Sequence, residues 1–169
     1  MNGPHRVWRM PADVDTDQLA PGSVMQFGIE VIARHCLETV EPGFAAQVQR
    51  GDVIVAGPNF GIGSSREQAA AALVHLGVAA VVAPSFGGLF FRNAFNLGLL
   101  LLTCPEAARI DHGGHIGIDA ATGLVTRADG STLPCEPIPG FLLDMVRAGG
   151  LLPQLKRRLA AATPTPESR

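Results

Sequence analysis

Cysteine is scarce in this sequence, and it is never grouped with other residues that bind metals. The three cysteines, Cys36, Cys104 and Cys135, are far apart along the 169 residues, and no Cys-x-x-Cys pair or Cys/His cluster occurs. Since no familiar ligand spacing for zinc or for an iron–sulfur cluster is present, we expect this chain to bind no metal by itself. The odd number of cysteines also disfavours the disulfide framework of a small secreted protein.

Long apolar runs and excess positive charge are missing as well. The run Leu99–Leu102 is far too short to cross a bilayer, and the stretch before Asp17 lacks the apolar segment of a signal peptide. The net charge is −2, whereas nucleic acids and anionic membranes attract proteins with a basic stripe. We therefore expect a cytoplasmic protein that binds neither nucleic acid nor membrane. The single lysine, Lys156, leaves one candidate for a Schiff base.

Apolar residues, by contrast, are abundant enough to build a full core. They make up 47% of the chain, and charged residues make up 17%, which excludes a disordered chain. The length suits one domain across residues 1–169. We expect its core over about residues 5–160 and a frayed tail at 162–169.

Buried strands alternate with helices along most of the chain. This order favours an α/β class with a mainly parallel central sheet and flanking helices. A β-hairpin and two short helices follow it. Strands are expected at Arg6–Met10, Asp52–Ala56, Val78–Ala83, Leu99–Thr103, His115–Asp119 and Leu124–Arg127, and helices at Gly28–Leu37, Phe44–Val48, Ser64–Gly77, Phe86–Leu97, Phe141–Ala148 and Leu151–Ala161.

The segment Asn59-Phe-Gly-Ile-Gly-Ser-Ser-Arg-Glu-Gln68 carries the chemistry. Its glycines let the backbone approach a ligand, and Arg66 offers a planar fork for a carboxylate at the start of a helix. The alternative is a tight turn before a well-capped helix, with Ser64 or Ser65 as the cap and Glu67 completing a capping box. A P-loop, a dinucleotide fingerprint and a hydrolase elbow are excluded, because the lysine, the third glycine and the Gly-x-Ser-x-Gly pattern are absent.

The run NFGIGSSREQA, followed by VAAVVAPSFGGLFFRNAFNLGLLLL, resembles the small subunits of 3-isopropylmalate dehydratases and the swivel domain of the aconitase superfamily. The start, RVWRMPADVDTDQLAPG, resembles the short archaeal and bacterial form, and the likeness covers roughly residues 5 to 160. The resemblance implies a swivelling β/β/α domain. It also implies a large partner subunit that carries a [4Fe-4S] cluster, and activity as a hydro-lyase on a small hydroxy diacid only together with that partner.

The same resemblance assigns roles to single residues. Ser64 matches the catalytic base of the family, and Ser65 and Arg66 match its ligands for a substrate carboxylate. Asp17 falls on an acidic position that lines the active site. A serine hydroxyl is a weak base at neutral pH, so we expect the helix N-terminus and Arg66 to stabilise its deprotonated oxygen. Glu67 is expected to be structural.

The sequence departs from the family at the loop that touches the variable group of the substrate. Where the short form usually carries Tyr-Leu-Arg, this chain reads Val24-Met25-Gln26-Phe27. Loss of the arginine disfavours a substrate with an extra carboxylate, whereas Met25 and Phe27 suit an apolar group.

The most favoured reaction is therefore the isomerisation of 2-isopropylmalate to 3-isopropylmalate, a step of leucine biosynthesis. The alternatives are the same chemistry on dimethylmalate or methylmalate, and a non-catalytic, regulatory domain that binds carboxylates.

Overall fold

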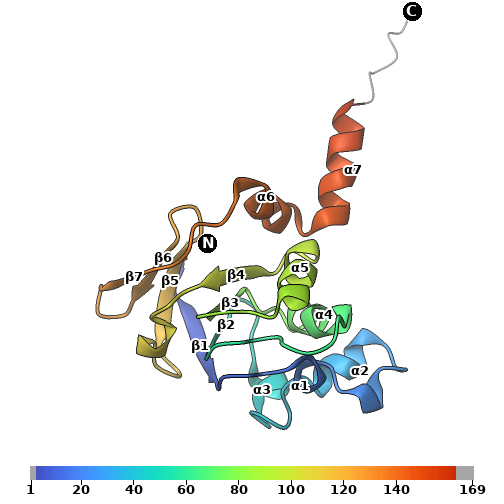
Figure 1. The fold of residues 1–169 in the computed structure, drawn as a ribbon, viewed down its shortest axis with the longest axis horizontal. Coiled ribbons are helices and arrows are strands. Elements are labelled where there is room, and N and C mark those ends of the chain that lie inside the picture. Colours follow the sequence, from blue (N-terminus) through green and yellow to red (C-terminus); the bar gives the residue numbers. More distant parts are fainter. Residues whose placement is uncertain (1–2, 163–169) are drawn as a thin grey trace, which may run out of the picture.

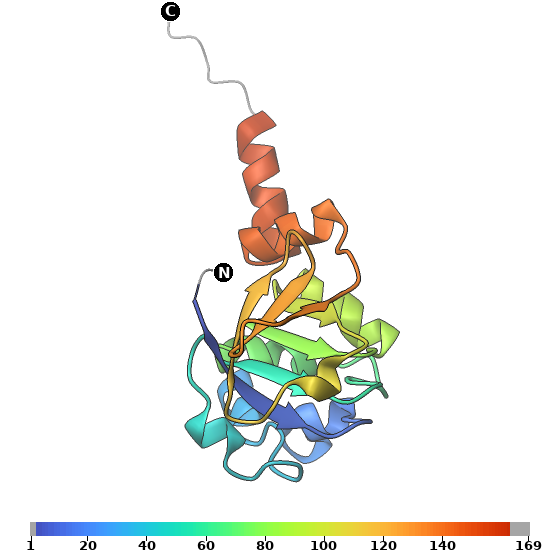
Figure 2. The ribbon, with the colours of Figure 1, turned by 90° about the vertical axis from the view of Figure 1, so that its left-hand side faces the viewer.

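The computed structural model describes residues 3–162, and its strands form one twisted sheet (Figures 1 and 2). The strand order is β4-β3-β2-β1-β5-β6-β7. The first four strands are parallel to one another, and β5, β6 and β7 extend the sheet in antiparallel fashion from β1. The strands are β1 (His5–Met10), β2 (Val53–Ala56), β3 (Ala80–Ala83), β4 (Leu100–Thr103), β5 (His115–Asp119), β6 (Leu124–Arg127) and β7 (Thr132–Pro134).

The helices gather mainly against the parallel half of the sheet. Figure 1 shows the antiparallel strands at one end of the molecule and α1, α2 and α4 together at the other. The helices are α1 (Thr16–Leu19), α2 (Ile29–Arg34), α3 (Phe44–Gln47), α4 (Glu67–His75), α5 (Gly88–Asn96), α6 (Gly140–Ala148) and α7 (Leu151–Ala162), with short 3-10 turns at Gly22–Val24 and Ala107–Arg109. In both views α7 projects away from the body. No helix in residues 3–162 is long and apolar enough to span a membrane.

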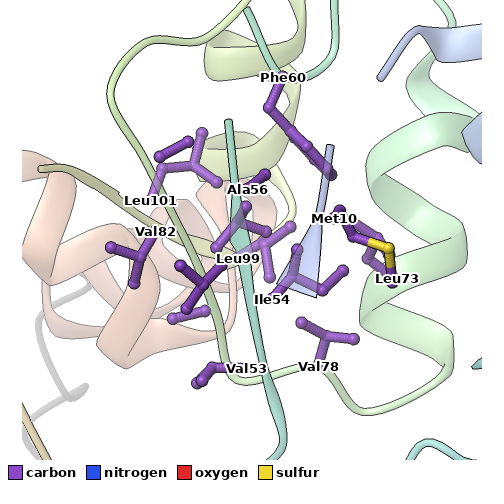
Figure 3. Packing of buried hydrophobic residues seen from close by; sticks show 14 of the residues in the cluster. Met10, Val53, Ile54, Ala56, Phe60, Leu73, Val78, Val82, Leu99 and Leu101 are labelled. Carbon is purple, nitrogen blue, oxygen red and sulfur yellow. The ribbon is translucent and has the colours of Figure 1, made fainter. Parts of the chain in front are cut away.

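The two central parallel strands, β2 and β3, are buried on both faces, as their continuous apolar runs predict. Every residue of β2 and β3 is buried. Figure 3 shows Met10 of β1 and Ile54 of β2 near Leu73 of α4. The sequence therefore predicted the α/β class and the parallel strands correctly.

A buried carboxylate joins β1 to β2 at the edge of this core. Asp52 Oδ2 accepts hydrogen bonds from Trp8 Nε1 at 2.9 Å, from the Gln49 amide at 2.9 Å and from Arg6 Nε at 3.1 Å. Burial alone would raise the pKa of Asp52, but the hydrogen bonds from Arg6, Gln49 and Trp8 outweigh it and hold the pKa below its ordinary value of 3.8. Three neighbouring residues thus hold Oδ2 of this carboxylate in its charged form.

The structure differs from the sequence-based expectations at several boundaries. The first expected helix ends at Arg34 rather than at Leu37, because Leu37 adopts a φ of +60° and the chain turns there. The helix expected from Phe86 begins at Gly88. A further strand of three residues, β7, was not expected. Residues 163–169 of the tail that we expected to fray lie outside the described part of the chain.

Candidate active site

The loop after β2 lies alongside the segment that follows β1. The Gly61 amide donates to the Val14 carbonyl at 2.7 Å, and the Thr16 amide donates to the Ile62 carbonyl at 2.8 Å. Gly61 is required here, because its φ is +79° and a Cβ atom would lie 2.2 Å from Cγ of Phe90. Two parallel strands that are neighbours thus bring two sequence motifs together at their carboxyl ends.

A capping box fixes the first of these motifs. Asp15 is the N-cap of α1: its carboxylate accepts from the Gln18 amide at 2.8 Å, and the Gln18 side chain accepts from the Asp15 amide at 2.9 Å. The Leu37 amide donates to the Gln18 carbonyl at 2.8 Å, so the excursion from residue 18 to residue 37 is closed at its base. Thr16 and Asp17 are therefore presented from a rigid first turn.

Ser64 is exposed, and its side chain points to the first motif. Its Oγ lies 3.1 Å from Oγ1 of Thr16, and its amide donates to that same Oγ1 at 3.0 Å. The expected capping box is wrong: α4 begins at Glu67, Arg66 is its N-cap, and no side chain caps it. The Ser64 hydroxyl contacts Thr16 instead of the first turn of α4.

Arg66 turns toward Asp17. Its Nη1 donates to Asp17 Oδ1 at 2.6 Å and to the Ala20 carbonyl at 3.0 Å. The hydrogen bond from Arg66, followed by that from the Gly22 amide, lowers the pKa of Asp17. Within residues 3–162, the hydrogen bonds of Arg66 go to Asp17 and Ala20 and none goes to Ser64 Oγ. Among residues 3–162, no acceptor bonds to Nε or Nη2 of Arg66, so that edge of the fork is available to a carboxylate.

Ser65 is exposed between these two residues. Its carbonyl accepts a hydrogen bond from Nδ2 of Asn93, a residue of α5, at 3.1 Å. The sequence did not identify Thr16 as a site residue. The one available signal for Thr16 was its place between Asp15 and Asp17.

The loop Val24–Phe27 lies next to the start of α4. Val24 and Met25 are partly buried, Gln26 is exposed, and Phe27 is 51% exposed. A hollow of about 390 Å³ separates this loop from α4, a volume in the range of small-ligand pockets. It is lined by Met25, Phe27, Ile29, Ile32, Glu67, Gln68 and Ala71. Two of the four predicted specificity residues therefore face an apolar hollow that reaches the residue after Arg66.

The cysteines do not form a cluster site. The Cys135 thiol donates a hydrogen bond to Cys104, which lowers the pKa of Cys104 to about 7. Cys36 is not part of this pair, and burial alone raises its pKa. Within residues 3–162, no group of three or more His, Cys, Asp or Glu side chains could hold a metal ion. The three cysteines in these residues do not have the arrangement that ligates an iron–sulfur cluster.

Comparison with known proteins gives the family. The model of the aconitase C-terminal domain matches residues 20–107. The 3-isopropylmalate dehydratase small subunit of Moorella thermoacetica is 46% identical over 150 residues, covering 87% of this chain and 90% of that protein. The methanogen homoaconitase small subunit of Methanothermobacter thermautotrophicus is 43% identical over 149 residues, covering 87% and 86%.

A solved structure has the same fold as this chain. The crystal structure of 3-isopropylmalate dehydratase from Methanocaldococcus jannaschii superposes with a TM-score of 0.87 at 37% identity. The match covers 94% of this chain and 95% of that one. The chain belongs to the aconitase C-terminal domain family, in the branch that contains the small subunits of 3-isopropylmalate dehydratase and of methanogen homoaconitase.

Proposed function

We propose that this chain is the small subunit of a hydro-lyase that isomerises 2-isopropylmalate to 3-isopropylmalate. The observation that carries the proposal is the meeting of two motifs on one exposed surface. Ser64 contacts Thr16, and Arg66 contacts Asp17, across 48 and 49 residues of sequence. The pairing sets a hydroxyl base beside a guanidinium that has one free edge.

Each residue has a role in this scheme. Ser64 Oγ, deprotonated, takes the proton from the carbon beside a carboxylate, and hydroxide leaves the neighbouring carbon, so that a double bond forms. Hydroxide then adds to the other carbon of the double bond, and Ser64 returns its proton to the carbon that the hydroxide left, which gives the isomer and regenerates deprotonated Ser64. Arg66 and Ser65 bind the carboxylate whose negative charge grows as the proton leaves. Asp17 orients Arg66 by fixing Nη1, which directs the Nε–Nη2 edge to the substrate.

The apolar hollow supports an alkyl side group on the substrate. Met25 and Phe27 offer apolar surface there, and Gln26 has no charge to pair with an additional carboxylate. Methylmalate and dimethylmalate are the closest competitors, because methylmalate carries a methyl group in place of isopropyl and dimethylmalate carries two separate methyl groups. A missing methylene changes selectivity by only about 1–3 kcal/mol, so the three substrates must be compared directly.

A large partner subunit completes the enzyme in this proposal. It carries the [4Fe-4S] cluster, which would act as a Lewis acid toward the leaving hydroxyl group. This chain contributes the base and the carboxylate ligands, and its closure over the partner would exclude water from Ser64. The small-subunit names of the relatives support such a partner.

The test is to produce the chain together with its large subunit and to follow alkene formation by absorbance under anaerobic conditions. We expect turnover of 2-isopropylmalate, and at least a 1,000-fold loss on Ser64→Ala with the complex still assembled. Ser131→Ala, the same change in a distant turn, serves as the matched control. If no hydroxy diacid is turned over although the cluster has formed, the chain is instead a carboxylate-binding regulatory domain. Wild-type rates in Ser64→Ala would refute the role of Ser64.

A further inference from the structure

Thr16 forms hydrogen bonds with both the backbone and the side chain of Ser64. Its Oγ1 accepts a hydrogen bond from the Ser64 amide at 3.0 Å and lies 3.1 Å from Ser64 Oγ. Thr16 is 2% exposed, so water does not compete for its hydroxyl. In the part of the chain that the structure describes, no other side chain forms a hydrogen bond with Ser64 Oγ.

The hydrogens of this pair decide what Thr16 can do. In the neutral pair either hydroxyl can donate to the other. Once Ser64 Oγ is deprotonated it has no hydrogen left, so the hydrogen between the two oxygens must come from Thr16. The Thr16 hydroxyl keeps a lone pair for the Ser64 amide at the same time, since a hydroxyl donates once and accepts twice. A single threonine thus fixes both the backbone and the side chain of Ser64.

The surroundings of Thr16 prevent it from moving away. Its amide donates to Ile62, its carbonyl accepts from Ala20 at 2.9 Å, and the capping box holds the preceding residue. Gly63 makes the close approach possible: its φ is +110°, and a Cβ atom there would lie 2.9 Å from Thr16 Oγ1. A donor held this rigidly needs no reorganisation when charge develops on its partner.

We propose that Thr16 is a positioning residue for the base: it holds the Ser64 side chain in place and donates a hydrogen bond to Ser64 Oγ whenever that oxygen is deprotonated. This inference rests on the proposed role of Ser64. It assigns to a buried threonine the stabilisation that the sequence had suggested for Arg66. Removal of the donor raises the pKa of Ser64 and lowers the rate of proton removal, but leaves the carboxylate ligands unchanged.

Two substitutions separate this role from packing. Thr16→Val keeps the shape of the side chain and removes the hydroxyl, whereas Thr16→Ser keeps the hydroxyl and removes a methyl group. For the complex with the large subunit, we expect Thr16→Val to lower kcat about 100-fold or more, as the loss of one preorganised donor does, with KM changed less than about twofold. Thr16→Ser should keep kcat within about fivefold of the wild type. Thr126→Val, at an exposed position of β6, is the matched control.

The pH profile supplies a readout that a packing defect would not change. With the donor lost, the rising limb of kcat shifts to higher pH in Thr16→Val, but not in Thr16→Ser. If Thr16→Val does not assemble with the large subunit, Thr16→Ala is compared with Thr16→Ser by the same criteria. A kcat within about threefold of the wild type in Thr16→Val, or equal losses in the Val and Ser variants, overturns the inference. Failure of the proposed function looks different, because the wild-type complex would then turn over no hydroxy diacid.

Discussion

Asp52 gives the sharpest test of the forces that hold the sheet together. Asp52→Asn keeps the shape of the side chain but removes its charge. The Trp8 indole and the Gln49 amide then donate to a neutral oxygen instead of a carboxylate. Since hydrogen bonds to charged groups are stronger by about 1 kcal/mol each, these two bonds account for about 2 kcal/mol. Arg6 adds little, because solvent screens its partly exposed side chain.

The assay is thermal unfolding of the chain across pH. For a chain of this length, about 2 kcal/mol lowers Tm by about 4–8 °C at pH 7. The pKa of Asp52 lies below its ordinary value of 3.8, so the charge of Asp52 stabilises the fold above about pH 4. That contribution is lost as the pH falls through the lowered pKa. The difference in Tm between the wild type and Asp52→Asn must therefore shrink below pH 4.

Asp144→Asn is the matched control, because Asp144 pairs with Arg147 at 3.3 Å on the exposed surface of α6. Exposed pairs of this kind contribute little, and we expect no measurable change in Tm. The reasoning is refuted if Asp52→Asn has the same Tm as the wild type at pH 7. A Tm difference that is as large at pH 3 as at pH 7 would refute it equally, since the charge would then not be its source.

Two further predictions concern the loop that carries Ser64. Gly61→Ala should lower Tm far more than Gly113→Ala in thermal melts: both glycines have a positive φ, but only at Gly61 would the new methyl group collide with Phe90. Equal losses would mean that backbone strain alone matters. Arg66→Lys should raise KM about tenfold or more in the steady-state assay of the complex, because an ammonium group cannot bind a carboxylate with two parallel hydrogen bonds. Arg92→Lys on α5 is its control, and an unchanged KM for Arg66→Lys would remove Arg66 from the substrate site.

The core was predictable because strands that are buried on both faces have continuous apolar sequences. Runs such as Val53–Ala56 and Leu100–Thr103 are apolar without alternation, and the helices between them dictate parallel pairing. β7 was not predictable for the opposite reason. It has three residues, only Leu133 is buried, and one of its members is a proline.

Only part of the candidate site could be predicted from the sequence. The run Ser64–Arg66 is recognisable as a motif, but local spacing gave Ser64 the wrong partner. Ser64 lies three residues before Glu67, which fits a capping box. Its hydroxyl instead forms a hydrogen bond with Thr16, 48 residues away. Local patterns contain no information about such a contact, because it depends on the register between β1 and β2. The same holds for the bond between Arg66 and Asp17.

The hydrogen bond that closes the excursion from residue 18 to residue 37 has an evolutionary consequence. Its ends are fixed to each other, and the bonds from this excursion to Asp17 and Arg66 come from Gly22 and Ala20, so Val24–Phe27 can vary in sequence while those bonds are kept. Closed loops of this kind tolerate change at low entropic cost. If the proposed function holds, a change of a few residues in Val24–Phe27 would give a new substrate preference while Ser64, Ser65 and Arg66 remain the same.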